Sequence, residues 1–332
     1  MKNAEANTVS HETSQPLVSA VIPTRNRPDL VCRAVRSALA QTYPNIEVIV
    51  VIDGPDPASF ASLEVLGDPR IRIIALEESV GGSEARNTGA REAQGSYIAL
   101  LDDDDEWLPE KIATQVAIAA KSTARGTVVM CGFLLRSSDG RDTLRPRRML
   151  RPGESAAEYI FDPAGGFKTS TFLCSRDLLL AVPFTRGLRG CQDPDWLLKV
   201  VAAGDHRFII ADQMLAVYYA PASVRNVTRT LDLNFKLDWI RSHRKLMTRR
   251  AYSLFILSMC APTVAERRFP IRQFFWLLRE CLFRGSANLN IFLHFMSLFF
   301  LPLSLRHRIR NFIDKIQKSR RSMSGSALIE SV

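Results

Sequence analysis

The chain has 332 residues, of which 46% are hydrophobic and 23% charged, so it can bury a sizeable core and is not a collagen-like, mucin-like or wholly disordered protein. Its six cysteines are scattered, with no C-x-x-C pair, which argues against a disulfide scaffold or a zinc site and suits a reducing compartment. The formal net charge is +10, yet residues 241–332 hold 17 Lys and Arg against 4 Asp and Glu, whereas residues 1–240 hold 27 against 30. We therefore expect a near-neutral globular part followed by a basic segment that meets an anionic surface.

From residue 17 onward, short β-branched runs alternate with amphipathic stretches, which is typical of βαβ units and a largely parallel sheet. Strands are expected at residues 17–22, 46–52, 71–76, 97–101, 127–135, 169–174, 207–211 and 215–219. Helices are expected from Pro28 to residue 39 and at 83–93, 108–121 and 196–203, with a loop or hairpin at 137–153. Residues 1–15 are polar and lack the apolar core of a secretory signal, so we interpret them as a disordered leader on a cytosolic chain.

After about residue 232 the chain changes to helical segments rich in Phe, Leu and Arg, at 251–260, 274–283 and 291–301. None has the roughly 20 uninterrupted apolar residues of a spanning helix. The last is flanked by arginines, which is typical of a helix lying on anionic lipid. We expect a membrane-associating extension over residues 232–318 and a flexible tail at 319–332. The alternative is that these helices pack on the body or on a second subunit.

Four aspartates and a glutamate, Asp102 to Glu106, follow the predicted strand at 97–101 directly. Clustered carboxylates repel one another unless a positive charge lies among them. Since side chains alternate along an extended chain, Asp102 and Asp104 can point to the same side and address one ion, and oxygen ligands favour Mg²⁺ or Mn²⁺. The alternative is a solvated acidic loop that caps the next helix.

Two further segments are predicted to reach the same edge of the sheet. Asp53 follows the strand at 46–52, and sheets of this kind bind ligands at the carboxyl ends of their strands. Residues 81–87 form a glycine-rich turn and a helix start, where backbone N–H groups attract anions, with Arg86 one turn in. Taken alone, Asp53-Gly54 is first a turn signal, and Arg86 could equally be an exposed arginine behind a helix cap.

Taken together, four blocks of this chain resemble, in order and spacing, the successive motifs of family 2 glycosyltransferases. They lie at residues 19–27, 50–54, 81–89 and 95–107. The resemblance covers roughly residues 17–230. It implies an α/β GT-A fold over residues 16–231, a Rossmann-like and mostly parallel sheet flanked by helices that binds a nucleotide-sugar, with a C-terminal helical extension and an inverting mechanism.

The resemblance also implies roles for single residues. The residues that it places at the nucleotide or its sugar are Pro23, Thr24, Arg27, Asp53 (on the base or ribose), Arg86, Asp102 and Asp103. Asp102 and Asp104 become the D-x-D pair that holds Mn²⁺ or Mg²⁺, with Asp104 as the direct ligand of first choice. Ile52 stands where the family often has a first acid, so the nucleotide stays open.

An inverting transfer needs a carboxylate that takes the proton of the attacking hydroxyl. The block at residues 190–198 resembles the family's Glu-Asp motif and makes Asp193 the general base, with Asp195 as runner-up because Gln192 replaces the usual Glu. Either aspartate could instead cap a helix that starts at Trp196. Trp196 could stack on a sugar or lie in the core, and Arg225 could reach the diphosphate or be an exposed arginine.

These features predict an enzyme that moves a sugar from a nucleotide-diphosphate donor to a hydroxyl acceptor, a lipid-linked glycan in surface polysaccharide synthesis. We expect it to be cytoplasmic and peripheral on the inner face of the plasma membrane. A non-catalytic GT-A-like scaffold that binds a nucleotide-sugar or a partner enzyme is the alternative. Nucleic-acid binding through the basic segment is disfavoured, because it leaves the acidic strand end without a role.

Overall fold

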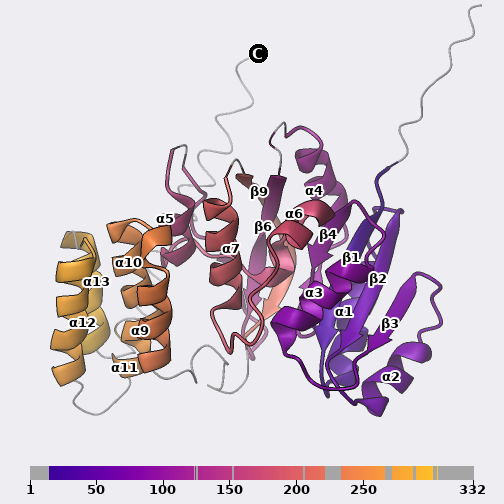
Figure 1. Cartoon of the computed structure of the whole chain (residues 1–332), viewed down its shortest axis with the longest axis horizontal. Coiled ribbons are helices and arrows are strands. Elements are labelled where there is room, and N and C mark those ends of the chain that lie inside the picture. Colours follow the sequence, from indigo (N-terminus) through magenta and orange to yellow (C-terminus); the bar gives the residue numbers. More distant parts are fainter. Residues whose placement is uncertain are drawn as a thin grey trace, which may run out of the picture. The chain divides into compact units, whose positions relative to one another are not determined.

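The computed structural model describes residues 15–122, 124, 126–151, 153–204, 206–220, 233–265, 271–286, 289–301 and 305. They form two compact units, one from the described residues up to 156 and from 164 to 220, the other from residues 157–163 and from 233 onward (Figure 1). The predicted tail at 319–332, all but the last residue of the predicted leader, and Arg225 lie outside the described residues.

The first unit is built on a sheet that has nine strands among the described residues, in the order β3-β2-β1-β4-β8-β6-β9-β5, with β7 paired to β6. The strands are β1 (Val18–Thr24), β2 (Ile46–Ile52), β3 (Ile71–Ala75), β4 (Tyr97–Leu100), β5 (Glu106–Trp107), β6 (Gly126–Arg136), β7 (Asp142–Arg145), β8 (Leu173–Ser175) and β9 (His206–Tyr219). Strands β1 to β4 pair in parallel, as predicted. Beyond β4 the sheet is mixed, because β8 runs antiparallel to both β4 and β6.

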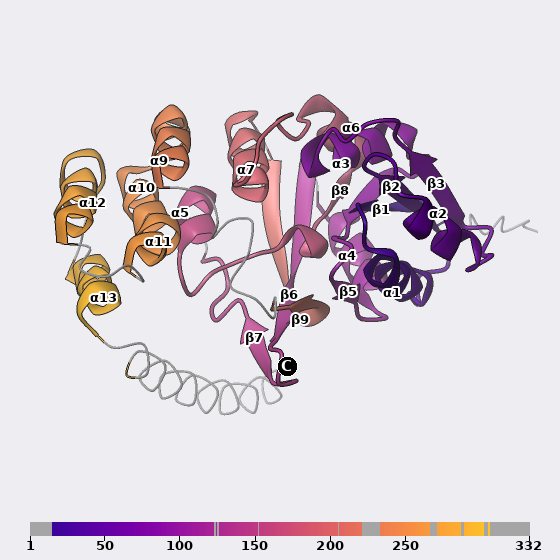
Figure 2. The same ribbon diagram turned by 90° about the horizontal axis from the view of Figure 1, so that it is seen from below.

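Helices cover both faces of this sheet. They are α1 (Pro28–Leu39), α2 (Pro57–Glu64), α3 (Gly82–Glu92), α4 (Lys111–Ala119), α6 (Arg176–Ala181), α7 (Gln192–Ala202) and the short 3₁₀ helix η1 (Thr169–Thr171). Figure 2 shows α3 and α6 on one face and α1 and α4 on the other. The sheet is apolar on both sides here, since every residue of β2 is buried. On the α3 side the approach is close, because a Cβ at Gly89 would lie 2.4 Å from Val21 Cγ1.

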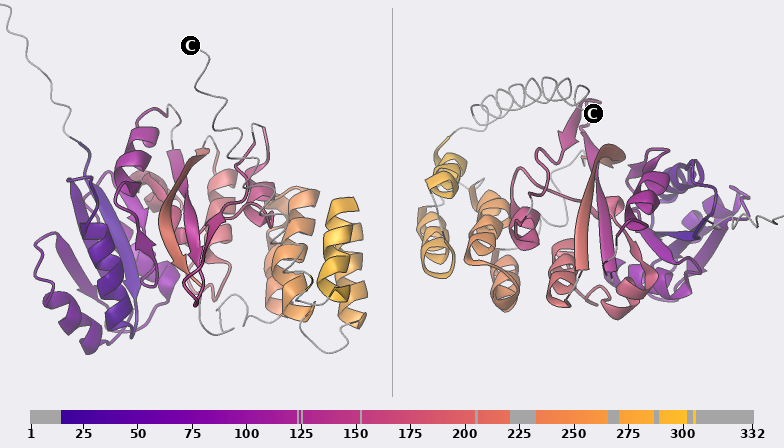
Figure 3. Two further views of the ribbon diagram at one scale, coloured as in Figure 1. Left: turned by 180° about the vertical axis from the view of Figure 1, so that it is seen from behind. Right: turned by 90° about the horizontal axis from the view of Figure 1, so that it is seen from above.

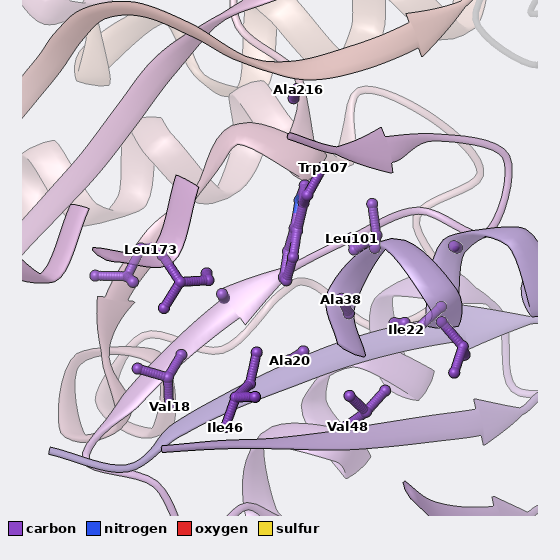
Figure 4. Packing of buried hydrophobic residues seen from close by; sticks show 14 of the residues in the cluster. Val18, Ala20, Ile22, Ala38, Ile46, Val48, Leu101, Trp107, Leu173 and Ala216 are labelled. Atoms are coloured by element: carbon purple, nitrogen blue, oxygen red, sulfur yellow. The ribbon is translucent and has the colours of Figure 1, made fainter. Parts of the chain in front are cut away.

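The hydrophobic core of the α1 side joins alternate residues of the strands to the helices. Ala38 of α1 lies above Ala20 and Ile22 of β1, and Trp107 lies near Leu173 (Figure 4). Each fully buried large aliphatic side chain contributes about 1.5–3 kcal/mol to folding. This core ends where the parallel strands end, so it holds the loops after β1, β2 and β4 at one edge of the sheet.

The second half of this unit differs from the prediction in three places. The strands predicted at 207–211 and 215–219 are one strand, β9, whose pairing with β6 shifts register around Gly132. Asp212 and Gln213, which look like a turn in the sequence, are therefore part of a bulged strand. The strand predicted from residue 169 begins as η1, and the helix predicted from Trp196 begins at Gln192.

The second unit consists of helices (Figure 3). They are α5 (Ala156–Phe161), α9 (Leu233–Ser242), η2 (Arg244–Leu246), α10 (Arg249–Phe255), the π-helical turn η3 (Ile256–Cys260), α11 (Ala261–Ala265), α12 (Ile271–Arg284) and α13 (Leu289–Phe300). Aromatic rings join them, with Phe161 packed edge-on against Trp239 and Phe255. Across the part of the chain that the structure describes, every helix is too short or too polar to cross a membrane.

Candidate functional site

The acidic run after β4 folds into a tight turn. The Asp105 N–H donates to the Asp102 carbonyl at 3.1 Å, and the turn brings carboxylate oxygens of Asp102, Asp104 and Asp105 within 4.8 Å of one another. The predicted D-x-D pair is thus together, with Asp105 as a third member. Asp105 was not predicted, because the side-chain alternation of a strand, which selects Asp102 and Asp104, stops at the turn.

Asp103 lies apart from the three clustered carboxylates and connects the turn to the end of β1. Its carboxylate accepts hydrogen bonds from Thr24 Oγ1 at 2.8 Å and Arg27 Nη1 at 3.0 Å, and Arg27 also reaches Asp104 at 3.2 Å. Burial raises the pKa of Asp103 to about 6, with Arg27 and Thr24 opposing the rise. The run is not a wholly solvated acidic loop, because Asp103 and Asp105 are both buried, whereas Asp102 and Asp104 are partly exposed.

The environment of Asp105 fits a cation. Ser170 Oγ donates to Asp105 Oδ2, while Asp105 Oδ1 is buried without a hydrogen-bond partner. Burial, followed by the charges of Asp102 and Asp104, raises the pKa of Asp105 well above its ordinary value. An orphaned carboxylate oxygen beside two more carboxylates is a donor set that suits Mg²⁺ or Mn²⁺, which take hard oxygen ligands.

A backbone contact from α1 holds the same turn. Arg33 Nη2 donates to the Asp104 carbonyl oxygen at 2.6 Å, its Nε lies 3.0 Å from Glu106 Oε1, and its Cζ lies 3.9 Å from the centre of the Tyr219 ring. Tyr219 in turn donates to Glu106 at 2.7 Å. Arg33 was not predicted, because nothing in a helical repeat marks which residue contacts a loop 71 positions later.

Asp53 is buried at the end of β2 and organises the loop before α3. Its carboxylate accepts hydrogen bonds from the Val80 N–H at 2.7 Å, the Gly81 N–H at 3.1 Å and Ser79 Oγ at 2.9 Å. Its own N–H donates to the Thr24 carbonyl at 2.9 Å. Asp53 therefore joins the ends of β1 and β2 to the start of α3.

Arg86 lies one turn into α3 and bridges the acidic turn to α7. It is 8% exposed, its Nη2 donates to Asp102 Oδ1, and its Nη1 donates to Gln192 Oε1 at 3.0 Å. Burial lowers the pKa of Arg86, but Asp102 and Asp193 raise it more, so that it stays above its ordinary value. The alternative of an exposed arginine is wrong.

The two candidate bases have different surroundings. Asp193 accepts a hydrogen bond from Thr169 Oγ1 at 2.5 Å, whereas Asp195 is 2% exposed and accepts from Thr185 Oγ1 at 2.6 Å. Burial and then the charge of Asp102 raise the pKa of Asp193, with Arg86 and Thr169 opposing. Neither aspartate caps α7, because its N-cap is Cys191. Asp193 is electrostatically linked to the acidic turn through Asp102.

Lys168 adds a positive charge to this group that the sequence analysis missed. Burial lowers its pKa, but Tyr218, Asp193 and Asp105 raise it above its ordinary value. Its Nζ lies 4.2 Å from the centre of the Tyr218 ring. No motif surrounds it in the sequence, so only the fold shows that it faces these acids.

Trp196 does not fit the sugar-stacking role. Its side chain is fully buried, stacks on Phe172 and Phe184 with ring centres 5.7 and 5.2 Å away, and donates from Nε1 to the Val182 carbonyl. Trp196 is a core residue of α7, so the predicted contact with a sugar is wrong and the core alternative is confirmed. Pro23, predicted beside the nucleotide, is partly buried near the end of β1.

The comparisons with known proteins agree with this geometry. A model described as glycosyl transferase family 2 matches residues 19–187. The amylovoran biosynthesis glycosyltransferase AmsB of Erwinia amylovora is 25% identical over 246 residues, which make up 70% of this chain and 79% of AmsB. Seven further similar proteins are covered over only 19–50% of their own length.

Solved structures show the same fold. S. aureus TarS in complex with UDP-GlcNAc has a TM-score of 0.56 and 16% identity, with 85% of this chain and 79% of that chain covered. The mannosyltransferase PcManGT of Pyrobaculum calidifontis, in complex with GDP-Man and Mn²⁺, also has a TM-score of 0.56 and 16% identity, with 94% and 88% covered. The mixed α/β sheet with its flanking helices is thus the GT-A fold, and the chain belongs to glycosyl transferase family 2.

Proposed function

We propose that this glycosyltransferase moves a sugar from a nucleoside-diphosphate donor to a hydroxyl group of a growing polysaccharide, with inversion at the anomeric carbon. The observation that carries the proposal is the meeting of an acidic turn, a buried arginine and a separate carboxylate at the strand ends. Arg86 contacts the turn through Asp102 and reaches α7 through Gln192, directly beside Asp193. The acidic turn, which would bind the donor, and Asp193, which would contact the acceptor, can therefore act in one reaction.

The donor half is the loop ends after β1, β2 and β4. A divalent ion, Mn²⁺ or Mg²⁺, would be held by Asp102, Asp104 and Asp105, and when bound would neutralise the departing diphosphate. Arg27 and Arg86 each bind an acid of this turn, so their charges also lie where an anionic donor would bind. PcManGT, which shares the fold, was solved with GDP-Man and Mn²⁺.

The acceptor half is the start of α7. Asp193 takes the proton of the acceptor hydroxyl as its oxygen attacks the anomeric carbon, and the bond from that carbon to the diphosphate oxygen breaks with its electron pair on the diphosphate. The Thr169 hydrogen bond orients the Asp193 carboxylate, and Arg86 and Lys168 favour its ionised form. Attack from the face opposite the leaving diphosphate gives inversion.

The acceptor is proposed to be a lipid-linked glycan at the inner face of the plasma membrane. AmsB, which is similar over 79% of its length, is named for the biosynthesis of a polysaccharide, amylovoran. The charge of residues 241–332, 17 Lys and Arg against 4 Asp and Glu, favours an anionic surface close to the acceptor.

The test is release of free nucleoside diphosphate from a panel of nucleotide-sugars that includes UDP-GlcNAc and GDP-mannose, with and without Mn²⁺. We expect Mn²⁺-dependent release from one donor, and about a 10²-fold lower rate for Asp193→Asn with unchanged donor binding. Asp177→Asn, an exposed acid on α6, is the matched control and should behave as the wild type. A chain that is stabilised by a donor but releases no diphosphate would be a scaffold, and the proposal would be wrong.

A further inference from the structure

The second unit presents an unusual outer surface on α12 and α13. Of the 13 large hydrophobic side chains that are exposed among the described residues, nine lie between 271 and 305. Eight of these nine belong to α12 and α13. We call them the α12–α13 face, and its members are Ile271, Phe275, Leu282, Phe283, Leu289, Phe292, Leu293 and Phe300. Such a concentration of apolar side chains on a folded unit indicates an interaction surface.

Helix α12 is apolar on two opposite sides. Its inner side buries Phe274, Leu277 and Cys281, and Phe274 packs against rings of α13. Its outer side leaves Phe275 61% exposed and Phe283 74% exposed. A helix that only packs on its own unit needs one apolar side and carries polar residues on the other, so the outer side is not explained by the fold.

The charges on this face are all of one sign. Arg272 and Arg279 of α12 are exposed, and the Arg279 guanidinium lies 5.7 Å from the Phe283 ring. The one acid among the described residues from 271 to 305 is Glu280, which is buried and paired with Arg241 and Arg284. The face therefore combines exposed rings with positive charge and presents no carboxylate.

We propose that the α12–α13 face docks on an anionic lipid bilayer, with its Phe and Leu side chains among the acyl chains and its arginines at the headgroups. Long arginine side chains can keep their charge at the headgroup level while the apolar residues beside them are buried. A second copy of the chain is a poorer occupant. A two-fold interface on this face would bring its arginines against the same arginines of the other copy.

This inference names the surface that meets the membrane in the proposed function, but its test does not depend on glycosyl transfer. The full chain is mixed with vesicles of phosphatidylcholine alone, or of phosphatidylcholine with 30% phosphatidylglycerol, and flotation is measured at low and high salt. We expect binding to the anionic vesicles at least about tenfold stronger than to the neutral ones, with salt weakening it.

Variants of the α12–α13 face test whether it is the surface that binds the vesicles. Phe275→Ser with Phe283→Ser should lower binding to anionic vesicles at least about tenfold, and Arg279→Gln should lower it and reduce its salt dependence. The matched control is Val65→Ser with Leu180→Ser, two exposed apolar residues of the first unit, which should bind as the wild type. Melting temperature and donor-dependent diphosphate release, measured without vesicles, should be unchanged in all of them, which separates a docking failure from a failure of the proposed enzyme.

Two results would overturn the proposal. One is flotation of the Phe275→Ser and Phe283→Ser double variant as strong as that of the wild type. The other is a wild-type dimer, seen by sedimentation, that this double variant dissociates while neither protein binds vesicles, because the occupant would then be a second copy.

Discussion

The hydrogen bond from Thr169 to Asp193 gives the sharpest test of the proposed base. Thr169 is 1% exposed, and its Oγ1 lies 2.5 Å from Asp193 Oδ1. Thr169→Val keeps the shape of the side chain and removes this donor. Because the bond favours the ionised carboxylate, its loss should raise the pKa of Asp193 above its already elevated value.

The size of the effect follows from the bond. A hydrogen bond to a charged group contributes about 1.5–3 kcal/mol, and about 1.4 kcal/mol is a factor of ten, so the higher pKa of Asp193 should slow the acid side of the profile about tenfold to a hundredfold. A base must be ionised to accept a proton, and below its pKa the ionised fraction falls tenfold per unit. At pH values well below the wild-type midpoint, Thr169→Val should therefore be at least about tenfold slower, and the difference should shrink as the pH rises through the midpoint.

The assay is kcat for sugar transfer between pH 5 and pH 9, with the donor that the panel of nucleotide-sugars identifies. The control is Thr171→Val, a second buried threonine of η1, which loses only a hydrogen bond to the Lys168 carbonyl at 2.7 Å. It should lower the melting temperature without moving the acid limb of the pH profile. An acid limb that stays in place in Thr169→Val, or moves equally in both variants, would refute the assignment of Asp193 as the base.

Three other perturbations test other parts of the structure. Asp104→Asn should reduce Mn²⁺-dependent diphosphate release about 10²-fold or more, because it removes a proposed metal ligand. The melting temperature should not fall, because the substitution also removes one of three crowded carboxylates. Diphosphate release that keeps its response to Mn²⁺ would exclude Asp104 as a ligand. Arg33→Gln removes the donor to the Asp104 carbonyl and should weaken Mn²⁺ binding about tenfold in a calorimetric titration, with the exposed Arg36→Gln as a control that leaves it unchanged. Gly89→Ala should cost about 1–3 kcal/mol in urea unfolding, because the new Cβ meets Val21; a variant as stable as the wild type would show that α3 can move away from the sheet.

Strands β1, β2 and β4 could be predicted from the sequence, because buried parallel strands are nearly continuous apolar runs and their ends carry turn residues. The site residues that directly follow those strands, such as Asp53 and Asp102, were predicted for the same reason. The later strands were harder to predict, since β8 and the bulge in β9 depend on which strand lies alongside rather than on local pattern.

Trp196 is a residue whose environment could not be predicted from the local sequence. An aromatic residue at a helix start beside the predicted base has the same local sequence whether it faces a ligand or the core. Its burial between Phe172 and Phe184 is decided by chain segments 24 and 12 residues earlier, which the local pattern does not contain. The same holds for Lys168, whose environment consists of acids distant in the chain.

Sequence alone determined strands β1 to β4, the edge of the sheet where acids gather and the family, because each of these is written in contiguous residues. Tertiary structure decided which acids share a site, which aspartate of α7 faces them, and which phenylalanines of the second unit stay exposed. The physical reason is that charge coupling and burial depend on distance in space, and Arg86, Asp102 and Gln192 come together only when α3, β4 and α7 have folded onto one sheet.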